Sequence, residues 1–271
     1  MTSWLGQYCL NVTDLERAVA FYTSLGLTCT SRTEIPDAFE AIVENASGGS
    51  KFQIAQQKNR SRPLDLGTGF WKLYVNTHDL HAIFKDAIAH GATVESAPER
   101  MERWPVSIAF VRDPDGYLVE LVTRHPWPDT VPANGPWLGQ YCINVTDIEA
   151  SIGFFELMGL DCTSRTEIEH AHEAILENRD RGSKLQLAQQ LDQNGPIRMG
   201  SMWKLYVHTD DCKALHDAAV GAGAPSIMEP TRLDRWPVTM AYVEAPDGYL
   251  VELVQRDAER QPQPLERSSP P

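Results

Sequence analysis

Apolar and polar residues alternate with the two-residue period of a β-strand in many short segments of this 271-residue chain. Helical periodicity interrupts them only at regular intervals. The first series reads as a strand, a helix that begins after Thr13 and ends near Leu25, and three more strands, over 7–12, 28–32, 39–44 and 51–56. A second series of the same kind follows a loop at 59–69, with strands at 71–75, 93–96, 107–111 and 118–122 and a helix at 80–90. The pattern predicts two successive β-α-β-β-β units.

The chain then repeats itself. Trp4-Leu-Gly-Gln-Tyr-Cys-Leu-Asn-Val-Thr-Asp14 returns as Trp137-Leu-Gly-Gln-Tyr-Cys-Ile-Asn-Val-Thr-Asp147, and Lys72-Leu-Tyr-Val75 returns as Lys204-Leu-Tyr-Val207. A repeat of this length indicates two homologous halves and four units in total. Because a single unit is too small to bury one face of its own sheet, the units should pair.

We therefore predict an α+β fold of four βαβββ modules in two tandem halves, paired into concave mixed sheets. The first domain should span 1–125 and the second 137–256. The stretch 126–136 is rich in Pro and reads as a linker, and the tail 257–271, rich in Gln, Pro, Arg and Ser, is expected to be disordered.

The last two strands of each half form a predicted β-hairpin with one unusual residue. Strand 106–111 is followed by Pro-Asp-Gly turn chemistry and by strand 117–122, in which Glu120 occupies a position that a half-buried strand normally gives to an apolar side chain. Its copy in the second half is Glu252. The question for function is what these two carboxylates face.

Composition narrows the classes of partner. A formal net charge of −13 disfavours nucleic acid, because phosphate binding relies on Lys and Arg. No run reaches the roughly 18 apolar residues needed to cross a bilayer, and the N-terminus lacks a basic-then-apolar signal, so we expect a cytoplasmic protein without membrane contact. The five cysteines have no metal-like or disulfide-like spacing and read as small core residues.

Several motifs resemble the vicinal oxygen chelate superfamily, which includes glyoxalase I, extradiol dioxygenases, fosfomycin resistance proteins and bleomycin-binding proteins. They are the repeated βαβββ pattern, the Val-Thr-Asp-Leu-Glu segment with Ala-Phe-Tyr-x-x-Leu-Gly-Leu, and Asp-Pro-Asp-Gly-Tyr-Leu-Val-Glu-Leu. The resemblance covers the chain up to about residue 256. It implies the fold more strongly than the reaction, because this superfamily hosts several chemistries.

In glyoxalase I a divalent metal takes its ligands from the first and last strands of paired units. The matching positions here are Gln7, Gln53, Lys72 and Glu120, with copies Gln140, Gln186, Lys204 and Glu252. Glyoxalase I pairs units from different halves, so that Gln7 and Gln53 would meet Lys204 and Glu252; other members pair adjacent units. The sequence leaves both arrangements open.

A lysine at a metal-ligand position changes the expected chemistry. Its ammonium has an unperturbed pKa of about 10.4 and no lone pair for a metal, so we predict no cofactor. Lys72 and Lys204 would instead pair with Glu120 and Glu252, and all four would be catalytic residues. The ammonium would stabilise an enolate while the carboxylate of Glu120 or Glu252 moves a proton on the adjacent carbon. The alternatives are an ion pair that only binds a ligand, and a divalent metal held by Gln7, Gln53 and Glu252 and by Gln140, Gln186 and Glu120.

Other repeated side chains are candidates for substrate binding beside the four glutamines. Trp104 and Trp236 precede the hairpin strands and could cover a ligand, and Arg32 and Arg165 could hold an anionic group. Strand alternation places Trp71 and Trp203 on the face opposite the neighbouring lysines.

The favoured function is a glyoxalase-like lyase or isomerase acting on a small carbonyl-bearing or oxygenated molecule. The alternative is a binding protein that sequesters an antibiotic or another small molecule. A ring-cleaving dioxygenase ranks third, since its iron needs two histidines that the matched positions lack. The partner is a small molecule, and the chain is either a monomer with two internal sites or a homodimer.

Overall fold

A computed structural model describes residues 1–46, 50–60, 62–127, 136–178, 182–193, 195–233 and 236–257. Most of the predicted linker at 126–136, and nearly all of the predicted tail at 257–271, lie outside these residues. The domain boundaries therefore stay a prediction. None of the helices in the described ranges combines the length and the apolar character that crossing a bilayer requires.

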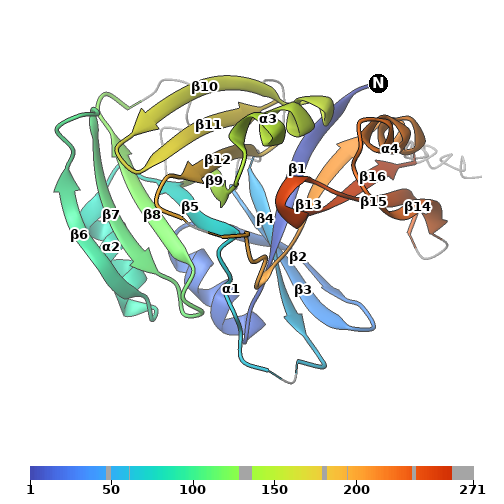
Figure 1. Cartoon of the computed structure of the whole chain (residues 1–271). Coiled ribbons are helices and arrows are strands. Elements are labelled where there is room, and N and C mark those ends of the chain that lie inside the picture. Colours follow the sequence, from blue (N-terminus) through green and yellow to red (C-terminus); the bar gives the residue numbers. More distant parts are fainter. Residues whose placement is uncertain are drawn as a thin grey trace, which may run out of the picture.

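Four βαβββ modules follow one another along the chain, as predicted (Figure 1). The first contains β1 (Ser3–Asn11), α1 (Leu15–Ser24), β2 (Thr28–Glu34), β3 (Ala38–Glu44) and β4 (Lys51–Gln57). The second contains β5 (Phe70–Asn76), α2 (Leu80–Ala89), β6 (Thr93–Arg100), β7 (Val106–Arg112) and β8 (Leu118–Arg124).

The second half repeats this order. Its first module contains β9 (Trp137–Asn144), α3 (Ile148–Leu157), β10 (Asp161–Ile168), β11 (Ala171–Glu177) and β12 (Lys184–Gln190). The last contains β13 (Met202–Thr209), α4 (Cys212–Gly221), β14 (Ser226–Leu233), β15 (Val238–Glu244), the 3-10 turn η1 (Pro246–Gly248) and β16 (Leu250–Arg256).

Each helix begins at an aspartate whose carboxylate accepts a hydrogen bond from the backbone N–H three residues later. These N-cap residues are Asp14, Asp79, Asp147 and Asp211, with distances of 2.9–3.0 Å. Such a bond satisfies one of the N–H groups that the first helical turn leaves without a partner. The same chemistry therefore fixes where all four helices start.

The strands form two eight-stranded mixed sheets, and each sheet takes strands from both halves. The strand order is β14-β15-β16-β13-β1-β4-β3-β2 in sheet A and β10-β11-β12-β9-β5-β8-β7-β6 in sheet B. The joints between halves are antiparallel, β1 with β13 and β5 with β9, whereas β4 and β16 run parallel to their central neighbours. The first module thus pairs with the fourth, and the second with the third.

One face of each sheet contributes to a shared core with the helices. Tyr8 of β1 and Tyr141 of β9, both fully buried, bring their rings to 3.8 Å across this core. The opposite face of each sheet carries a smaller apolar cluster, around Cys9 and Tyr206 in sheet A and around Tyr74 and Cys142 in sheet B. The candidate functional residues lie on these opposite faces.

Candidate functional site

The strand order decides the pairing that the sequence left open. In sheet A, Cys9 lies opposite both Lys204 and Gln53, while Tyr206 lies opposite both Gln7 and Glu252. In sheet B, Cys142 lies opposite both Lys72 and Gln186. Each quartet therefore takes its glutamines from one half and its lysine and glutamate from the other.

The lysine and the glutamate of each quartet form a buried ion pair. Lys72 Nζ lies 2.8 Å from Glu120 Oε2, Lys204 Nζ lies 2.6 Å from Glu252 Oε2, and all four residues are 8% exposed. Burial alone would lower the pKa of each lysine, but the charge of the adjacent glutamate and its hydrogen bond raise that pKa above the ordinary value. Both lysines are therefore ammonium ions at neutral pH.

The two glutamines of each quartet bind each other. Gln7 Nε2 donates to Gln53 Oε1 at 3.0 Å, and Gln140 Nε2 donates to Gln186 Oε1 at 2.8 Å. This bond fixes the orientation of both amides and leaves the Nε2 of Gln53 and of Gln186 to donate to a further group.

A second carboxyl group, absent from our sequence prediction, faces each quartet. Glu40 of β3 lies opposite Ala55, two residues from Gln53, and Glu173 of β11 lies opposite Ala188, two residues from Gln186, so each glutamate shares a face of its sheet with a glutamine of the quartet. Burial raises the pKa of both carboxyl groups, and the nearby lysine opposes that rise. The repeat contained a signal for them, because Glu-Ala-Ile occurs at 40–42 and again at 173–175.

The aromatic surroundings make the two sites different. In sheet A the Tyr242 hydroxyl donates to Glu252 Oε2 at 3.0 Å and lies 3.3 Å from Lys204 Nζ. In sheet B the equivalent residue is Phe110, whose ring centre lies 5.5 Å from Lys72 Nζ. The ion pair of sheet A is thus held by an additional hydroxyl that sheet B lacks.

The predicted placement of Trp71 and Trp203 is wrong. Lys72 Nζ lies 4.1 Å from the ring centre of Trp71, and Lys204 Nζ lies 4.5 Å from that of Trp203. The strand register skips each tryptophan at a β-bulge, between Phe70 and Lys72 and again between Met202 and Lys204. A bulge interrupts the alternation of side chains, so these rings reach the face of the lysines and form cation–π contacts.

A cavity of about 740 Å³ opens over the sheet B quartet. Its polar lining includes the quartet and Glu173, together with four further residues: Glu99, Arg124, His125 and Thr166. Its apolar wall comes mainly from the hairpin strand β7 and the segment before it: Met101, Trp104, Val106, Ile108 and Phe110. Trp104 therefore contributes to the cavity as expected, and Trp236 precedes β15 in an equivalent turn with a similar exposure of 39%.

The predicted role of Arg32 and Arg165 in substrate binding stays a prediction. Arg32 is ion-paired with Glu16 of α1, and Arg165 with Glu149 of α3. In the strand register each arginine is opposite an alanine of the shared core, and the adjacent threonine instead is opposite Glu40 or Glu173. The arginines therefore link strands to helices, and neither of them lines the sheet B cavity.

The residues present do not fit a divalent metal. The ammonium nitrogen occupies the space 2.6–2.8 Å from the carboxylate where a metal would bind, and it offers no lone pair. One glutamine oxygen in each site is already engaged by the other glutamine. Across the described ranges no three His, Cys, Asp or Glu side chains cluster as metal ligands. We therefore derive no chemical step through a metal.

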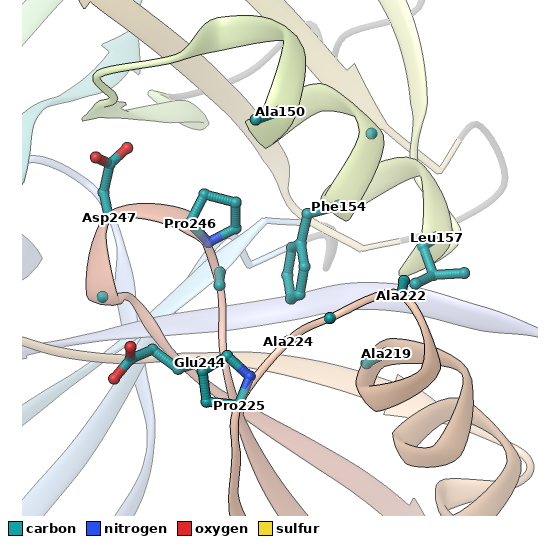
Figure 2. A pocket seen from close by; sticks show the side chains of 14 residues that line it. Ala150, Phe154, Leu157, Ala219, Ala222, Ala224, Pro225, Glu244, Pro246 and Asp247 are labelled. Atoms are coloured by element: carbon teal, nitrogen blue, oxygen red, sulfur yellow. The ribbon is translucent and has the colours of Figure 1, made fainter.

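A separate hollow of about 520 Å³ lies between α3, α4 and the turn at η1, away from both quartets (Figure 2). Its lining includes Ala150, Phe154, Ala222, Ala245 and Asp247. Small side chains explain the hollow. The first half carries Arg17, His90 and Asp113 at the positions equivalent to Ala150, Ala222 and Ala245.

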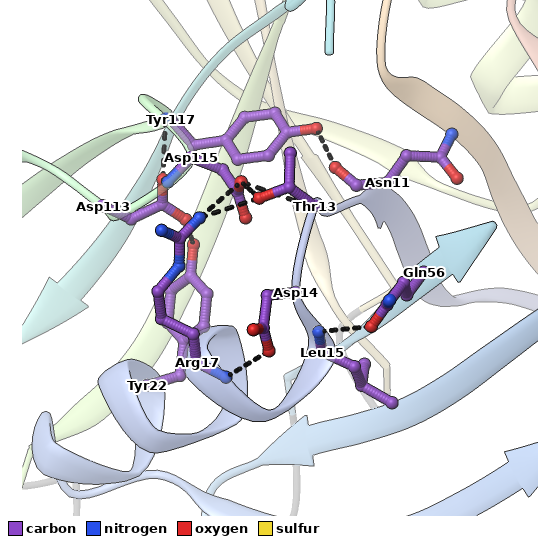
Figure 3. Close-up of polar contacts among 10 residues, drawn as sticks. All are labelled: Asn11, Thr13, Asp14, Leu15, Arg17, Tyr22, Gln56, Asp113, Asp115 and Tyr117. Carbon is purple, nitrogen blue, oxygen red and sulfur yellow. Dashed lines mark hydrogen bonds and ion pairs between the residues drawn. The ribbon is translucent and has the colours of Figure 1, made fainter. Parts of the chain in front are cut away.

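In the first half this place is filled by a polar network between α1 and the turn that joins β7 to β8 (Figure 3). Asp113 accepts hydrogen bonds from the hydroxyl of Tyr22 at 2.8 Å and from the backbone N–H groups of Asp115 and Tyr117 at 2.9 and 2.8 Å. Asp115 is ion-paired with Arg17 at 3.2 Å. The second half has Phe155 and Ala245 where the first has Tyr22 and Asp113, so both partners of the buried bond changed together.

Comparison with known proteins agrees with this architecture. The model of the Glyoxalase/Bleomycin resistance protein/Dioxygenase superfamily matches residues 4–121 and again 137–253. The chain is 31% identical over 149 residues to Lactoylglutathione lyase GLX1 of Arabidopsis thaliana, a match that covers 54% of this chain and 50% of that protein. A probable lactoylglutathione lyase of Vibrio parahaemolyticus is 28% identical over 118 residues, which are 42% of this chain and 85% of that protein.

Solved structures show the same fold. The crystal structure of glyoxalase I from Zea mays superimposes with a TM-score of 0.82 at 21% identity, covering 94% of this chain and 92% of the other. A putative dioxygenase from Bacillus subtilis gives a TM-score of 0.68 at 15% identity. The chain matches about half the length of the plant lactoylglutathione lyases to which it is similar. With two matches that together span most of its length, the chain belongs to the glyoxalase/bleomycin resistance protein/dioxygenase superfamily.

Proposed function

We propose that this protein is a glyoxalase-like lyase or isomerase that acts on a small α-oxygenated carbonyl compound, with a lysine ammonium in the role that a metal has in glyoxalase I. One observation carries the proposal: in both sites a buried Lys–Glu ion pair stands among two oriented glutamines. The similarity to lactoylglutathione lyases supports this class of reaction.

The chemistry follows from the charge of the lysine. When a proton leaves the carbon next to a carbonyl group, negative charge develops on the carbonyl oxygen. A buried ammonium beside that oxygen stabilises the charge more strongly than water does, because the low local dielectric strengthens the interaction. Glu120 and Glu252 keep the lysines charged and in place, and a carboxylate facing the same cavity moves the proton between carbons.

A binding protein is the second candidate, and one feature of the sheet B cavity favours it. Its wall of Trp104, Val106, Ile108 and Phe110 is large and apolar, as in sites that hold a drug-sized molecule without chemistry. A ring-cleaving dioxygenase is disfavoured by the donor set, since no histidine stands at the positions that would hold iron.

The decisive test is turnover of the hemithioacetal of methylglyoxal and glutathione before and after chelation, together with metal analysis of the purified protein. We expect turnover that a chelator leaves unchanged, and loss of turnover in the double variant Lys72→Gln/Lys204→Gln. Lys85→Met, on the exposed side of α2, is the control. Stoichiometric metal with chelator-sensitive turnover would contradict the ammonium mechanism. Ligand binding without any turnover would establish the binding protein.

A further inference from the structure

The second carboxyl group beside each quartet comes from a strand that contributes nothing to the ion pair. Glu173 of β11 lies opposite Thr166 and Ala188, and it lines the sheet B cavity together with Lys72 and Glu120. Glu40 of β3 occupies the same place in sheet A. Both are half-buried, so each combines access to a ligand with partial removal from water.

The two kinds of glutamate differ in their electrostatic partners. Glu120 and Glu252 are each bound directly to a lysine ammonium, at 2.8 and 2.6 Å. Among the described residues, the ion pairs include neither Glu173 nor Glu40. A carboxylate whose charge is already neutralised by an ammonium is a weak base, whereas one without its own cation is free to accept a proton.

The glutamines of each quartet lie beside these additional carboxyl groups. In sheet B, Gln140 donates to Gln186 at 2.8 Å, and Glu173 lies opposite Ala188, two residues from Gln186 on the same face of the sheet. In sheet A, Gln7 donates to Gln53 at 3.0 Å, and Glu40 lies opposite Ala55, two residues from Gln53. Burial raises the pKa of each glutamate, and the neighbouring glutamine opposes that rise and so favours the ionised form.

We propose that Glu173 and Glu40 are the catalytic acid–base residues of the two sites, while the Lys72–Glu120 and Lys204–Glu252 pairs bind and polarise the oxygen of the substrate. This inference rests on the proposed function and assigns the proton transfer within it. The substrate class is an α-hydroxycarbonyl compound, such as the adduct of a thiol with an α-dicarbonyl compound.

The reaction balances without an oxidant or a reductant. Glu173 takes the proton from the hydroxyl-bearing carbon, the electrons of that C–H bond form a C=C bond, and the carbonyl electrons move to the oxygen beside Lys72. The protonated Glu173 then returns the proton to the former carbonyl carbon. The proton of the substrate hydroxyl group passes to the oxygen beside Lys72. The carbon that carried the hydroxyl group thereby becomes the new carbonyl carbon.

The environment of these glutamates suits a general base. Burial raises the pKa of Glu173 and Glu40, and the adjacent Lys72 or Lys204 limits the rise. A carboxylate with a raised pKa is more basic than an ordinary glutamate.

The test compares Glu40→Gln/Glu173→Gln with wild type on the hemithioacetal of methylglyoxal and glutathione. General acid–base catalysis commonly contributes about 100-fold to 10,000-fold. We expect kcat to fall by such a factor with KM little changed, since the ion pairs that bind the substrate remain. Glu34→Gln/Glu167→Gln is the matched control, because these equivalent residues lie on exposed positions of β2 and β10.

A second pair of variants separates chemistry from folding. Glu40→Ala/Glu173→Ala leaves space for a small carboxylate, and added formate should restore part of the turnover. Two outcomes would overturn the assignment and leave the proposed function standing. The glutamine double variant could turn over the substrate as fast as wild type, or the alanine double variant could fold and show no increase in turnover with formate. A wild-type protein without turnover would overturn the proposed function and the assignment with it.

Discussion

The buried carboxyl group of Asp113 gives the protein a measurable dependence of stability on pH. Asp113 lies in the turn between β7 and β8 and is 3% exposed. Burial raises its pKa from 3.8 to about 6, although hydrogen bonds from Tyr22, Tyr117 and Asp115 oppose the rise. The folded protein therefore holds this proton more tightly than the unfolded chain does.

The size of the effect follows from the two pKa values. Between about pH 4 and pH 6 the folded state binds more protons at this residue than the unfolded state, so the free energy of unfolding falls as the pH rises. The rise of about two units in the pKa of Asp113 corresponds to about 3 kcal/mol of free energy of unfolding. The protein loses this stability between about pH 4 and pH 6, and no further loss from this residue follows above pH 6. Asp113→Asn keeps the shape and cannot titrate, so it should remove this loss.

Urea unfolding at pH 4, 5, 6 and 7 checks the prediction. Relative to wild type, Asp113→Asn should gain about 3 kcal/mol on going from pH 4 to pH 7. Asp86→Asn, an exposed substitution on α2, should show no such trend. If the difference between wild type and Asp113→Asn were the same at pH 4 and pH 7, the carboxyl group would not be buried as described.

Three further sets of substitutions test buried polar contacts, each by urea unfolding at pH 7. Asp113→Ala combined with Tyr22→Phe copies the Ala245 and Phe155 of the second half. The double variant should lose about 1–2 kcal/mol less free energy of unfolding than the sum of the two single variants. Strictly additive losses would contradict the Tyr22–Asp113 hydrogen bond. Lys72→Met should lower the free energy of unfolding by about 3–5 kcal/mol, because Glu120 is left buried without its cation. Lys72→Met/Glu120→Leu should recover most of that loss. Equal losses in the two variants would contradict the ion pair. Tyr242→Phe should cost about 1 kcal/mol at most, because Phe110 fills the equivalent position in sheet B, and a much larger loss would mean that the hydroxyl is essential to the fold.

Local chemistry made most of the fold predictable. The strand periodicity, the predicted start of a helix after Thr13 and the repeated hairpin gave the order of elements and the four modules. The sequence prediction ended the strand at 93–96, whereas β6 continues to Arg100. This extension includes Pro98, which is tolerated because β6 lies at the edge of sheet B and its backbone need not donate on both sides.

The sites were predictable only where a residue follows the alternation of its strand. Lys72 and Glu120 do so, and their side chains meet as expected. Trp71 does not, because the bulge beside it becomes visible only in the register with the partner strand. Glu173 was missed because only the pairing of β11 with β12 places it on the same face as Gln186. The ion pair of Arg165 with Glu149 was not predicted, because the sequence does not show which face of β10 turns toward the helix.

The exchange of strands between the halves has a consequence for how this duplicated chain tolerates damage. A duplication commonly provides a spare copy, so that one copy can decay while the other keeps the function. Here a lesion that unfolds one half removes the glutamines of one quartet and the lysine and glutamate of the other. Neither quartet survives such a lesion, so the two copies cannot replace each other.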